Sequence, residues 1–207
     1  MNIQLLNEPF PHVVIYDFYT EKELEDIKHE LKFLTKPDKL MPPGIMHGMV
    51  EPTNHHALLL EDAYANRKIS DILTIFKRKY DKNLVDLIVD KFPEFMKIKH
   101  INSRITKVRY YYNDDAYPPH IDITRDFLAF SYFHSHPRKF SGGELHCTDY
   151  NYTLDCSDNT FMLLPSYVKH EVLKVQIGDD EYFNGNGRYC VSQFLDVIPH
   201  QIDKKLA

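Results

Sequence analysis

An amphipathic pattern near the start of the chain predicts its first helix, over residues 21–34. The apolar side chains of this segment recur at helical spacing, at Leu24, Ile27, Leu31 and Leu34. Thr20 and Glu23 have the spacing of a capping box, in which each side chain bonds to a backbone N–H near the other residue. The same periodicity predicts helices over residues 66–79 and 82–91, and Pro93 closes the second of these.

From Ile101 onward the pattern changes to short β-rich runs bounded by turn residues, of which Ser141-Gly142-Gly143 is one. The runs predict strands over residues 105–112, 127–133, 143–148, 160–164, 171–176 and 189–197, after an earlier strand over 11–18. Strands of this length and spacing are typical of a jelly roll. The apolar stripes of the preceding helices need a partner, which we expect to be the outer face of the sheet. The predicted fold class is therefore α+β, a cupin-like jelly roll with N-terminal helices.

Length and composition indicate one globular domain. The chain has 207 residues and is 43% hydrophobic, and no linker rich in Pro, Gly or Ser divides it. We expect residues 1–100 to give mainly helical support and residues 101–200 to form the functional core. A net charge of −5 argues against general nucleic-acid binding. No signal peptide or apolar run long enough for a membrane helix is present, and the three cysteines form no metal-binding pattern, so we expect a cytoplasmic protein without membrane contact.

His120 and Asp122 are the first candidate metal ligands. In an extended chain, side chains two positions apart project from the same face, with Cα atoms about 6.6 Å apart. Pro118 and Pro119 favour an extended approach to this pair. An imidazole and a carboxylate so placed can both bind one ion at about 2.0–2.2 Å.

His170 and Arg188 complete the candidate site. His170 follows an apolar strand, so we expect it at a strand end, where it would be the third metal ligand. Two His and one Asp form a facial triad that leaves coordination positions open, as in non-haem Fe(II) sites. Arg188 lies between a glycine and a β run, which favours an inward guanidinium that needs an anion.

These motifs, in this order, resemble the Fe(II)/2-oxoglutarate dioxygenases, and within them the prolyl 4-hydroxylase-like branch. The order is H-x-D at His120, S-G-G-E-L from Ser141, H-E-V at His170 and G-R at Arg188, and the opening segment from Asn7 to Thr20 is also similar. The resemblance implies a double-stranded β-helix, the jelly roll of that family. It also implies that His120, Asp122 and His170 form the catalytic metal site, with Fe(II), 2-oxoglutarate, O₂ and optionally ascorbate as cofactors.

The resemblance assigns Arg188 to the distal carboxylate of 2-oxoglutarate. Arg188 follows His170 at a greater distance than is usual in the family, so Lys174 is a second candidate for this role. A Tyr is expected to contact the cosubstrate, with Tyr110 as first choice and Tyr132 as second. His134, His136 and His146 are expected as pocket or rim residues rather than ligands.

The implied reaction is hydroxylation of a prolyl residue in a peptide or protein, with release of succinate and CO₂. The same chemistry on a free amino acid, another small metabolite or a nucleobase is the alternative substrate assignment. A metal-binding jelly roll without turnover is the alternative outside this class of enzyme. A zinc hydrolase is a further alternative, although the sequence has no H-E-x-x-H motif to supply a general base.

Overall fold

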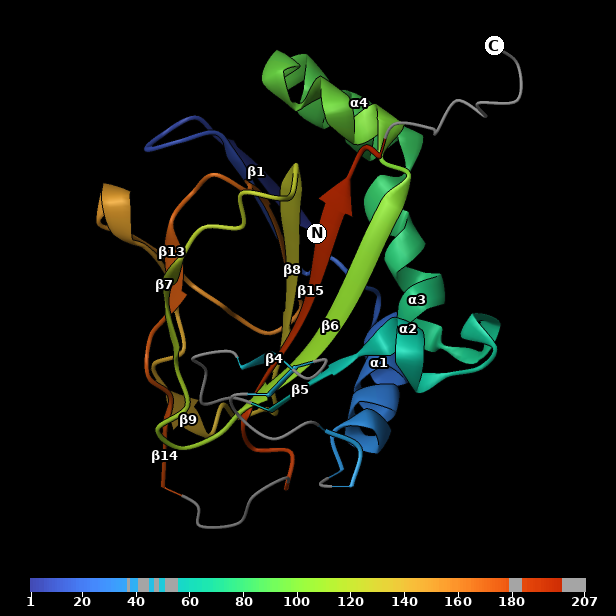
Figure 1. Ribbon diagram of the computed structural model, residues 1–207, viewed down its shortest axis with the longest axis vertical. Helices are drawn as coiled ribbons and strands as arrows, with labels where there is room; N and C mark the ends of the chain where they lie inside the picture. Colours follow the sequence, from blue (N-terminus) through green and yellow to red (C-terminus); the bar gives the residue numbers. More distant parts are fainter. Residues whose placement is uncertain (37, 41–44, 47–48, 51–55, 179–183, 199–207) are drawn as a thin grey trace.

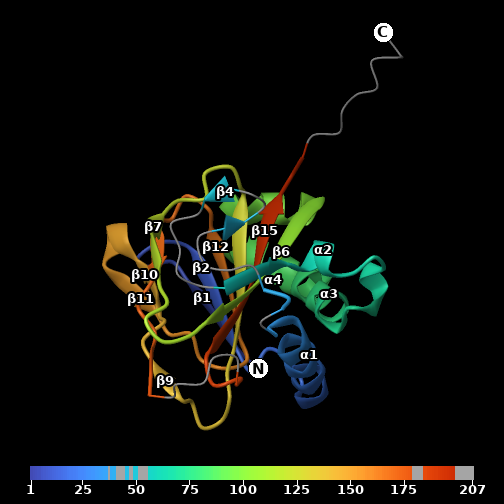
Figure 2. The same cartoon turned by 60° about the horizontal axis from the view of Figure 1, so that its bottom comes forward.

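In the computed structural model, two antiparallel sheets face each other and helices cover the outer side of the larger one (Figures 1 and 2). The structure describes residues 1–36, 38–40, 45–46, 49–50, 56–178 and 184–198. The larger sheet has seven strands in the order β1-β2-β12-β8-β15-β6-β5, and the smaller has four in the order β11-β10-β13-β7. The predicted jelly roll with helices on its outer face is confirmed.

The strands are short, apart from two long ones in the larger sheet. Their bounds are β1 (Asn2–Leu6), β2 (His12–Tyr16), β3 (Ile45–Met46), β4 (Met49–Val50), β5 (His56–Leu59), β6 (Ser103–Tyr111), β7 (Tyr117–His120), β8 (Phe127–Phe133), β9 (Phe140–Ser141), β10 (Leu145–Cys147), β11 (Tyr152–Leu154), β12 (Thr160–Pro165), β13 (His170–Val172), β14 (Gln176–Ile177) and β15 (Arg188–Asp196). The helices are α1 (Glu21–Leu34), α2 (Leu60–Ala63), α3 (Asp71–Ile75) and α4 (Lys82–Lys91), with 3₁₀ turns η1 (Arg67–Ile69), η2 (Phe76–Tyr80), η3 (Pro93–His100) and η4 (Thr148–Tyr150).

Helix α1 has the predicted bounds and the predicted cap. The backbone N–H of Thr20 donates to Glu23 at 2.8 Å, and the N–H of Glu23 donates to the Thr20 hydroxyl at 3.3 Å. Ile27, Leu31 and Leu34 are buried, so the apolar stripe of the helix faces the core. Helix α4 also has the predicted bounds. None of the helices in the described part of the chain is long and apolar enough to cross a membrane.

The segment predicted as one helix over residues 66–79 is instead divided into η1, α3 and η2. The division falls at Ser70, whose side chain accepts a hydrogen bond from the N–H of Leu73 at 3.1 Å and so begins a new helix. Ile69, just before the division, is 62% exposed. An internal N-cap therefore overrides the hydrophobic periodicity.

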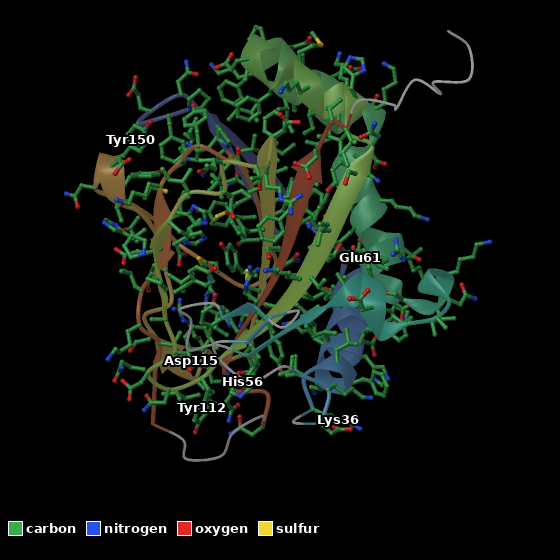
Figure 3. All side chains as sticks on the ribbon, in the orientation of Figure 1. Lys36, His56, Glu61, Tyr112, Asp115 and Tyr150 are labelled. Carbon is green, nitrogen blue, oxygen red and sulfur yellow. The ribbon has the colours of Figure 1, made fainter. Side chains whose placement is uncertain are left out.

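The first hundred residues are not purely helical support, because β1, β2 and β5 belong to the larger sheet. Helix α2 is tied to that sheet through Glu61, whose carboxylate accepts the N–H of Thr106 on β6 at 2.8 Å (Figure 3). The hydrophobic core runs without a break from the strands to α1 and α4. The helices thus brace the larger sheet and leave its inner face to the cavity described next.

Candidate metal centre

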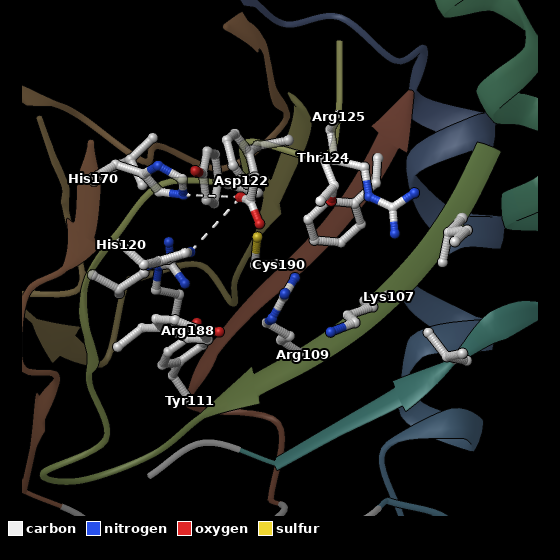
Figure 4. A pocket seen from close by; sticks show the side chains of 18 residues that line it. Lys107, Arg109, Tyr111, His120, Asp122, Thr124, Arg125, His170, Arg188 and Cys190 are labelled. Atoms are coloured by element: carbon white, nitrogen blue, oxygen red, sulfur yellow. Dashed lines mark ion pairs between the residues drawn. The ribbon is translucent and has the colours of Figure 1, made fainter. Parts of the chain in front are cut away.

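His120, Asp122 and His170 meet at one end of the smaller sheet (Figure 4). His120 ends β7 and His170 begins β13, and these two residues are direct partners in the antiparallel ladder. The Nε2 atoms of both imidazoles lie 3.7 Å from Oδ2 of Asp122. The structure thus brings together the three ligands expected from the sequence.

Backbone carbonyls orient both imidazoles. Nδ1 of His120 lies 2.9 Å from the carbonyl oxygen of Pro118, and Nδ1 of His170 lies 2.9 Å from that of Val168. A carbonyl oxygen can only accept, so each Nδ1 carries the proton and each Nε2 directs its lone pair toward Asp122. A hydrogen bond that fixes the metal-binding tautomer is the usual support of a histidine ligand.

His170 is kept neutral by its surroundings. Burial lowers its pKa to about 4, and the neighbouring His120 acts in the same direction. Only the neutral imidazole can bind a metal. His170 is therefore in the ligating form throughout the neutral pH range.

A cavity of about 400 Å³ opens beside the three ligands, and Arg188 on β15 lies in its wall. Arg188 is 1% exposed, and its Nε and Nη1 have no hydrogen-bond partner among the described residues. Nη2 has only the thiol of Cys156, at 3.7 Å. The rings of Tyr111 and Tyr132 lie 4.6 and 4.8 Å from its Cζ. An unpaired buried guanidinium is unfavourable, so this part of the cavity fits an anion.

The two candidate tyrosines lie in different places. Tyr132 on β8 lines the cavity, and its hydroxyl has no nitrogen or oxygen partner among the described residues. Tyr110 does not line the cavity: its hydroxyl accepts the N–H of Gly187 at 3.0 Å, at the start of β15. Its neighbour Tyr111 lines the cavity instead. Tyr110 therefore supports the turn that leads to Arg188, and Tyr111 and Tyr132 face the ligand space.

The remaining candidates lie outside the cavity. His134 and His136 gather around Asp158, and Nε2 of His136 is 2.8 Å from a carboxylate oxygen that Lys28 also contacts. His146 bonds to the hydroxyl of Thr153 at 2.9 Å. Lys174 is largely exposed and lies 3.4 Å from Asp114. None of these residues lines the cavity that contains Arg188.

Sequence reasoning missed the basic side chains of the cavity wall, at Lys107, Arg109 and Arg125, and the aromatic ring of Phe194 between them. Lys107, Arg109 and Tyr111 alternate on β6, so they share its inner face. The alternation was visible in the sequence, but two basic residues on an inward face contradict the usual exposure of charge.

No protein-family model matches the sequence, and no curated protein matches it significantly. Solved structures do match. A prolyl 4-hydroxylase of Pseudomonas putida is similar with a TM-score of 0.61 and 13% identity, over 91% of this chain and 93% of that one. A prolyl hydroxylase of Trichoplax adhaerens, in complex with a peptide fragment of hypoxia inducible factor, has a TM-score of 0.63 and 12% identity, over 89% and 83%.

A third match is an oxidoreductase of the 2OG-Fe(II) oxygenase family from Burkholderia pseudomallei. Its TM-score is 0.59 and its identity 16%, over 90% of this chain and 86% of that one. All three similarities extend over nearly the whole chain at low sequence identity, so what the proteins share is the fold. This protein has the jelly-roll fold of the prolyl 4-hydroxylases and other 2OG-Fe(II) oxygenases.

Proposed function

We propose that this protein is an Fe(II)- and 2-oxoglutarate-dependent dioxygenase that hydroxylates prolyl residues in a peptide or protein and releases succinate and CO₂. The observation that carries the proposal is the unpartnered guanidinium of Arg188 in the wall of the cavity that also contains His120, Asp122 and His170. A site for metal alone would not need a buried cation beside it. A site for a metal-chelating dicarboxylate does.

The donor set fits Fe(II). Two neutral imidazoles and one carboxylate on one side of an ion leave the opposite positions open, as in other non-haem Fe(II) oxygenases. His120 and His170 would bind through Nε2 and Asp122 through a carboxylate oxygen. Thiolate ligands are absent from this group of residues, which disfavours a structural zinc site.

Arg188 fits the distal carboxylate of 2-oxoglutarate. Its partnerless Nε and Nη1 lie on different edges of the guanidinium, and a carboxylate can accept from either edge in a planar arrangement that also uses Nη2, whose only partner is a thiol at 3.7 Å. Tyr132 lines the same cavity, and its hydroxyl, which has no nitrogen or oxygen partner among the described residues, can donate a further hydrogen bond. These are the only two cosubstrate contacts we assign.

Fe(II) with 2-oxoglutarate and O₂ supplies the oxidising chemistry when bound. The chain contributes position and shielding. The facial triad would hold the ion and Arg188 would bind the cosubstrate, while the Tyr111 and Tyr132 rings shield the buried charge from water. The part of the cavity lined by Tyr117 and Thr124 is left for the substrate. Similarity to prolyl hydroxylases, one of them bound to a peptide, supports a peptidyl proline as that substrate.

The test has two stages. Anaerobic Fe(II) protein is first titrated with 2-oxoglutarate and followed through the visible charge-transfer band expected for a chelated 2-oxo acid. Succinate formation is then measured with proline-containing peptides, free amino acids and nucleobases. A missing band overturns the oxygenase assignment. A band with turnover only on amino acids or nucleobases keeps the reaction class and overturns the peptidyl substrate.

A further inference from the structure

A second buried guanidinium, that of Arg109, lines the same cavity without a carboxylate partner. Arg109 is 6% exposed and lies on β6, opposite Cys190 on β15. Its Nη1 donates to the hydroxyl of Ser192, and no ion pair to it exists among the described residues. Figure 4 shows the side chain pointing from β6 into the cavity. A buried cation satisfied by one hydroxyl is incomplete without an anion.

The other arginine near the Phe194 ring, Arg125, is already neutralised. Nη1 of Arg125 lies 2.7 Å from Oδ2 of Asp196, so that guanidinium has its carboxylate. The Cζ atoms of Arg109 and Arg125 are both 5.7 Å from the centre of the Phe194 ring. Arg125 has a carboxylate partner and Arg109 has none among the described residues, so of these two arginines Arg109 is the one available to bind an anionic ligand.

Arg109 is close to the metal centre. The ring of Tyr117 lies 4.2 Å from the His120 ring and 6.0 Å from Cζ of Arg109, so one side chain neighbours both the metal ligand and the guanidinium. An anion bound at Arg109 would therefore lie near the metal ligands, in the cavity that Arg188 also lines.

Neither carboxylate of the cosubstrate is available to bind Arg109. In the proposed function, on which this step depends, one carboxylate of 2-oxoglutarate chelates the metal and the other binds Arg188. A third carboxylate has to come from the substrate. We infer that the substrate carries a carboxylate close to the C–H bond that is oxidised, and that Arg109 binds it.

A carboxylate fits better than a phosphate ester. Nε and Nη2 of Arg109 remain for a ligand after Nη1 has bonded to Ser192, and two donors on one edge match the two oxygens of a carboxylate. The aromatic faces of Tyr117 and Phe194 suit the apolar part of the same substrate.

The test uses matched pairs of probes that differ only in this charge. The full chain is loaded with Mn(II) and 2-oxoglutarate, and binding near the metal is measured as paramagnetic broadening of the probe's proton signals. N-acetyl-L-proline is compared with N-acetyl-L-prolinamide for an α-carboxylate. N-acetyl-prolyl-glutamate α-amide is compared with its glutamine analogue for an acidic side chain, and dimethyl phosphate represents a phosphodiester. The better bound carboxylate identifies the source as a free amino acid or an acidic peptide.

We expect at least one carboxylate to bind about tenfold or more tightly than its amide, a difference of about 1.4 kcal/mol. Arg109→Gln should remove this preference, and Arg109→Lys should keep part of it because the charge survives without the planar fork. Arg104→Gln is the control, since Arg104 is an exposed arginine of the same strand outside the cavity, against the Tyr80 ring. Arg109→Met should also raise the midpoint of thermal unfolding without ligands, which loss of a merely structural arginine would lower.

The inference is overturned if no carboxylate exceeds its amide, if Arg109→Gln leaves the preference unchanged, or if dimethyl phosphate binds most tightly. It is also overturned if Arg109→Gln weakens 2-oxoglutarate binding as much as probe binding, because Arg109 would then belong to the cosubstrate. Failure of the wild type to bind 2-oxoglutarate would instead overturn the proposed function. The probe comparison is then repeated with Mn(II) alone, and it decides the Arg109 inference by the same criteria.

Discussion

Two side chains of this protein, Arg188 and Lys79, are buried cations with opposite surroundings. Both are 1% exposed. Arg188 borders an open cavity, whereas Lys79 is packed in the core, with Nζ 3.5 Å from the centre of the Phe76 ring and 3.3 Å from Oε1 of Gln193. Burial lowers the pKa of Lys79 well below its usual value. Lys79 can lose its proton, while a guanidinium stays charged and needs an anion.

Arg188→Ala should raise the 2-oxoglutarate concentration needed for half-saturation by roughly two decades or more, because breaking a buried charge pair costs about 3–5 kcal/mol. Arg188→Lys should be intermediate. The measurement is the anaerobic titration of the visible band, with Fe(II) affinity as the control that should stay unchanged. A variant that titrates like the wild type would remove Arg188 from the cosubstrate site.

His170→Ala should weaken Fe(II) binding by more than about 100-fold, since loss of an outer-shell partner alone already costs about 10–100-fold. His120→Ala and Asp122→Ala should act in the same direction. His146→Ala is the matched control, because His146 lies outside the cavity. Equal metal affinity in all four variants would contradict the facial triad.

Lys79→Met should stabilise the protein most near neutral pH, with a gain that shrinks as the pH rises toward about 10.4. The folded-state pKa of Lys79 is below its unfolded value, so folding releases a proton between these two pKa values, and wild-type stability rises with pH across that window. Met removes the titrating group. Denaturant unfolding of both proteins from pH 7 to pH 10 measures the difference, and a gap that is constant or widens with pH would argue against a neutral Lys79.

Single residues also show what the sequence could reveal about the site. His120, Asp122, His170 and Arg188, which the structure brings to one cavity, could be proposed from the sequence because spacing, strand ends and motif order are local signals. Tyr110 and Tyr111 differ only in which face of β6 they occupy, and a shift by one residue exchanges the faces. That choice depends on the register with β15, which no local pattern contains.

At the scale of elements, the turn before β10 determines whether Arg188 fits. Gly143 has φ +76°, and a Cβ there would lie 2.7 Å from Cδ of Arg188 and 2.9 Å from the side chain of Val175. The sequence identified Ser141-Gly-Gly as a turn. It did not reveal the close approach of Gly143 to Arg188, because these two residues are far apart along the chain.

Gly143→Ala should therefore displace Arg188 and weaken 2-oxoglutarate binding while the proposed metal ligands, on or beside β7 and β13, keep their affinity for the metal. Gly178→Ala is the control, since a Cβ at Gly178 would meet no atom within 4 Å. The anaerobic titration and an Fe(II) titration measure the two effects. Unchanged 2-oxoglutarate binding in Gly143→Ala would show that the turn can shift away from Arg188 without any loss of 2-oxoglutarate affinity.

At the scale of the whole molecule, helices and strands of the first half are part of one core with the jelly roll. Hydrophobic periodicity predicted the strand-rich second half and α1, because amphipathic segments carry a strong local signal. It did not predict β1 and β5, whose place at the two edges of the larger sheet depends on long-range pairing with β2 and β6.

Deleting residues 1–34 should prevent stable folding, because it removes β1, β2 and α1 together. β2 pairs with β12 inside the larger sheet, and Val13, Val14 and Ile15 are fully or almost fully buried. Soluble yield and thermal unfolding, compared with the full chain, test this. A truncated protein that folds and forms succinate at the full rate would contradict it.

The ligand groups are divided between the two sheets. The metal ligands lie on or beside β7 and β13 of the smaller sheet, and Arg188, Tyr132 and Tyr111 lie on strands of the larger one. A molecule that chelates the metal at one end and binds Arg188 at the other would be a reversible, non-covalent cross-link between the two sheets. Binding of this molecule should make local opening of the two sheets less frequent. Amide protons of β7 and β13 should therefore exchange more slowly with metal and 2-oxoglutarate together than with metal alone.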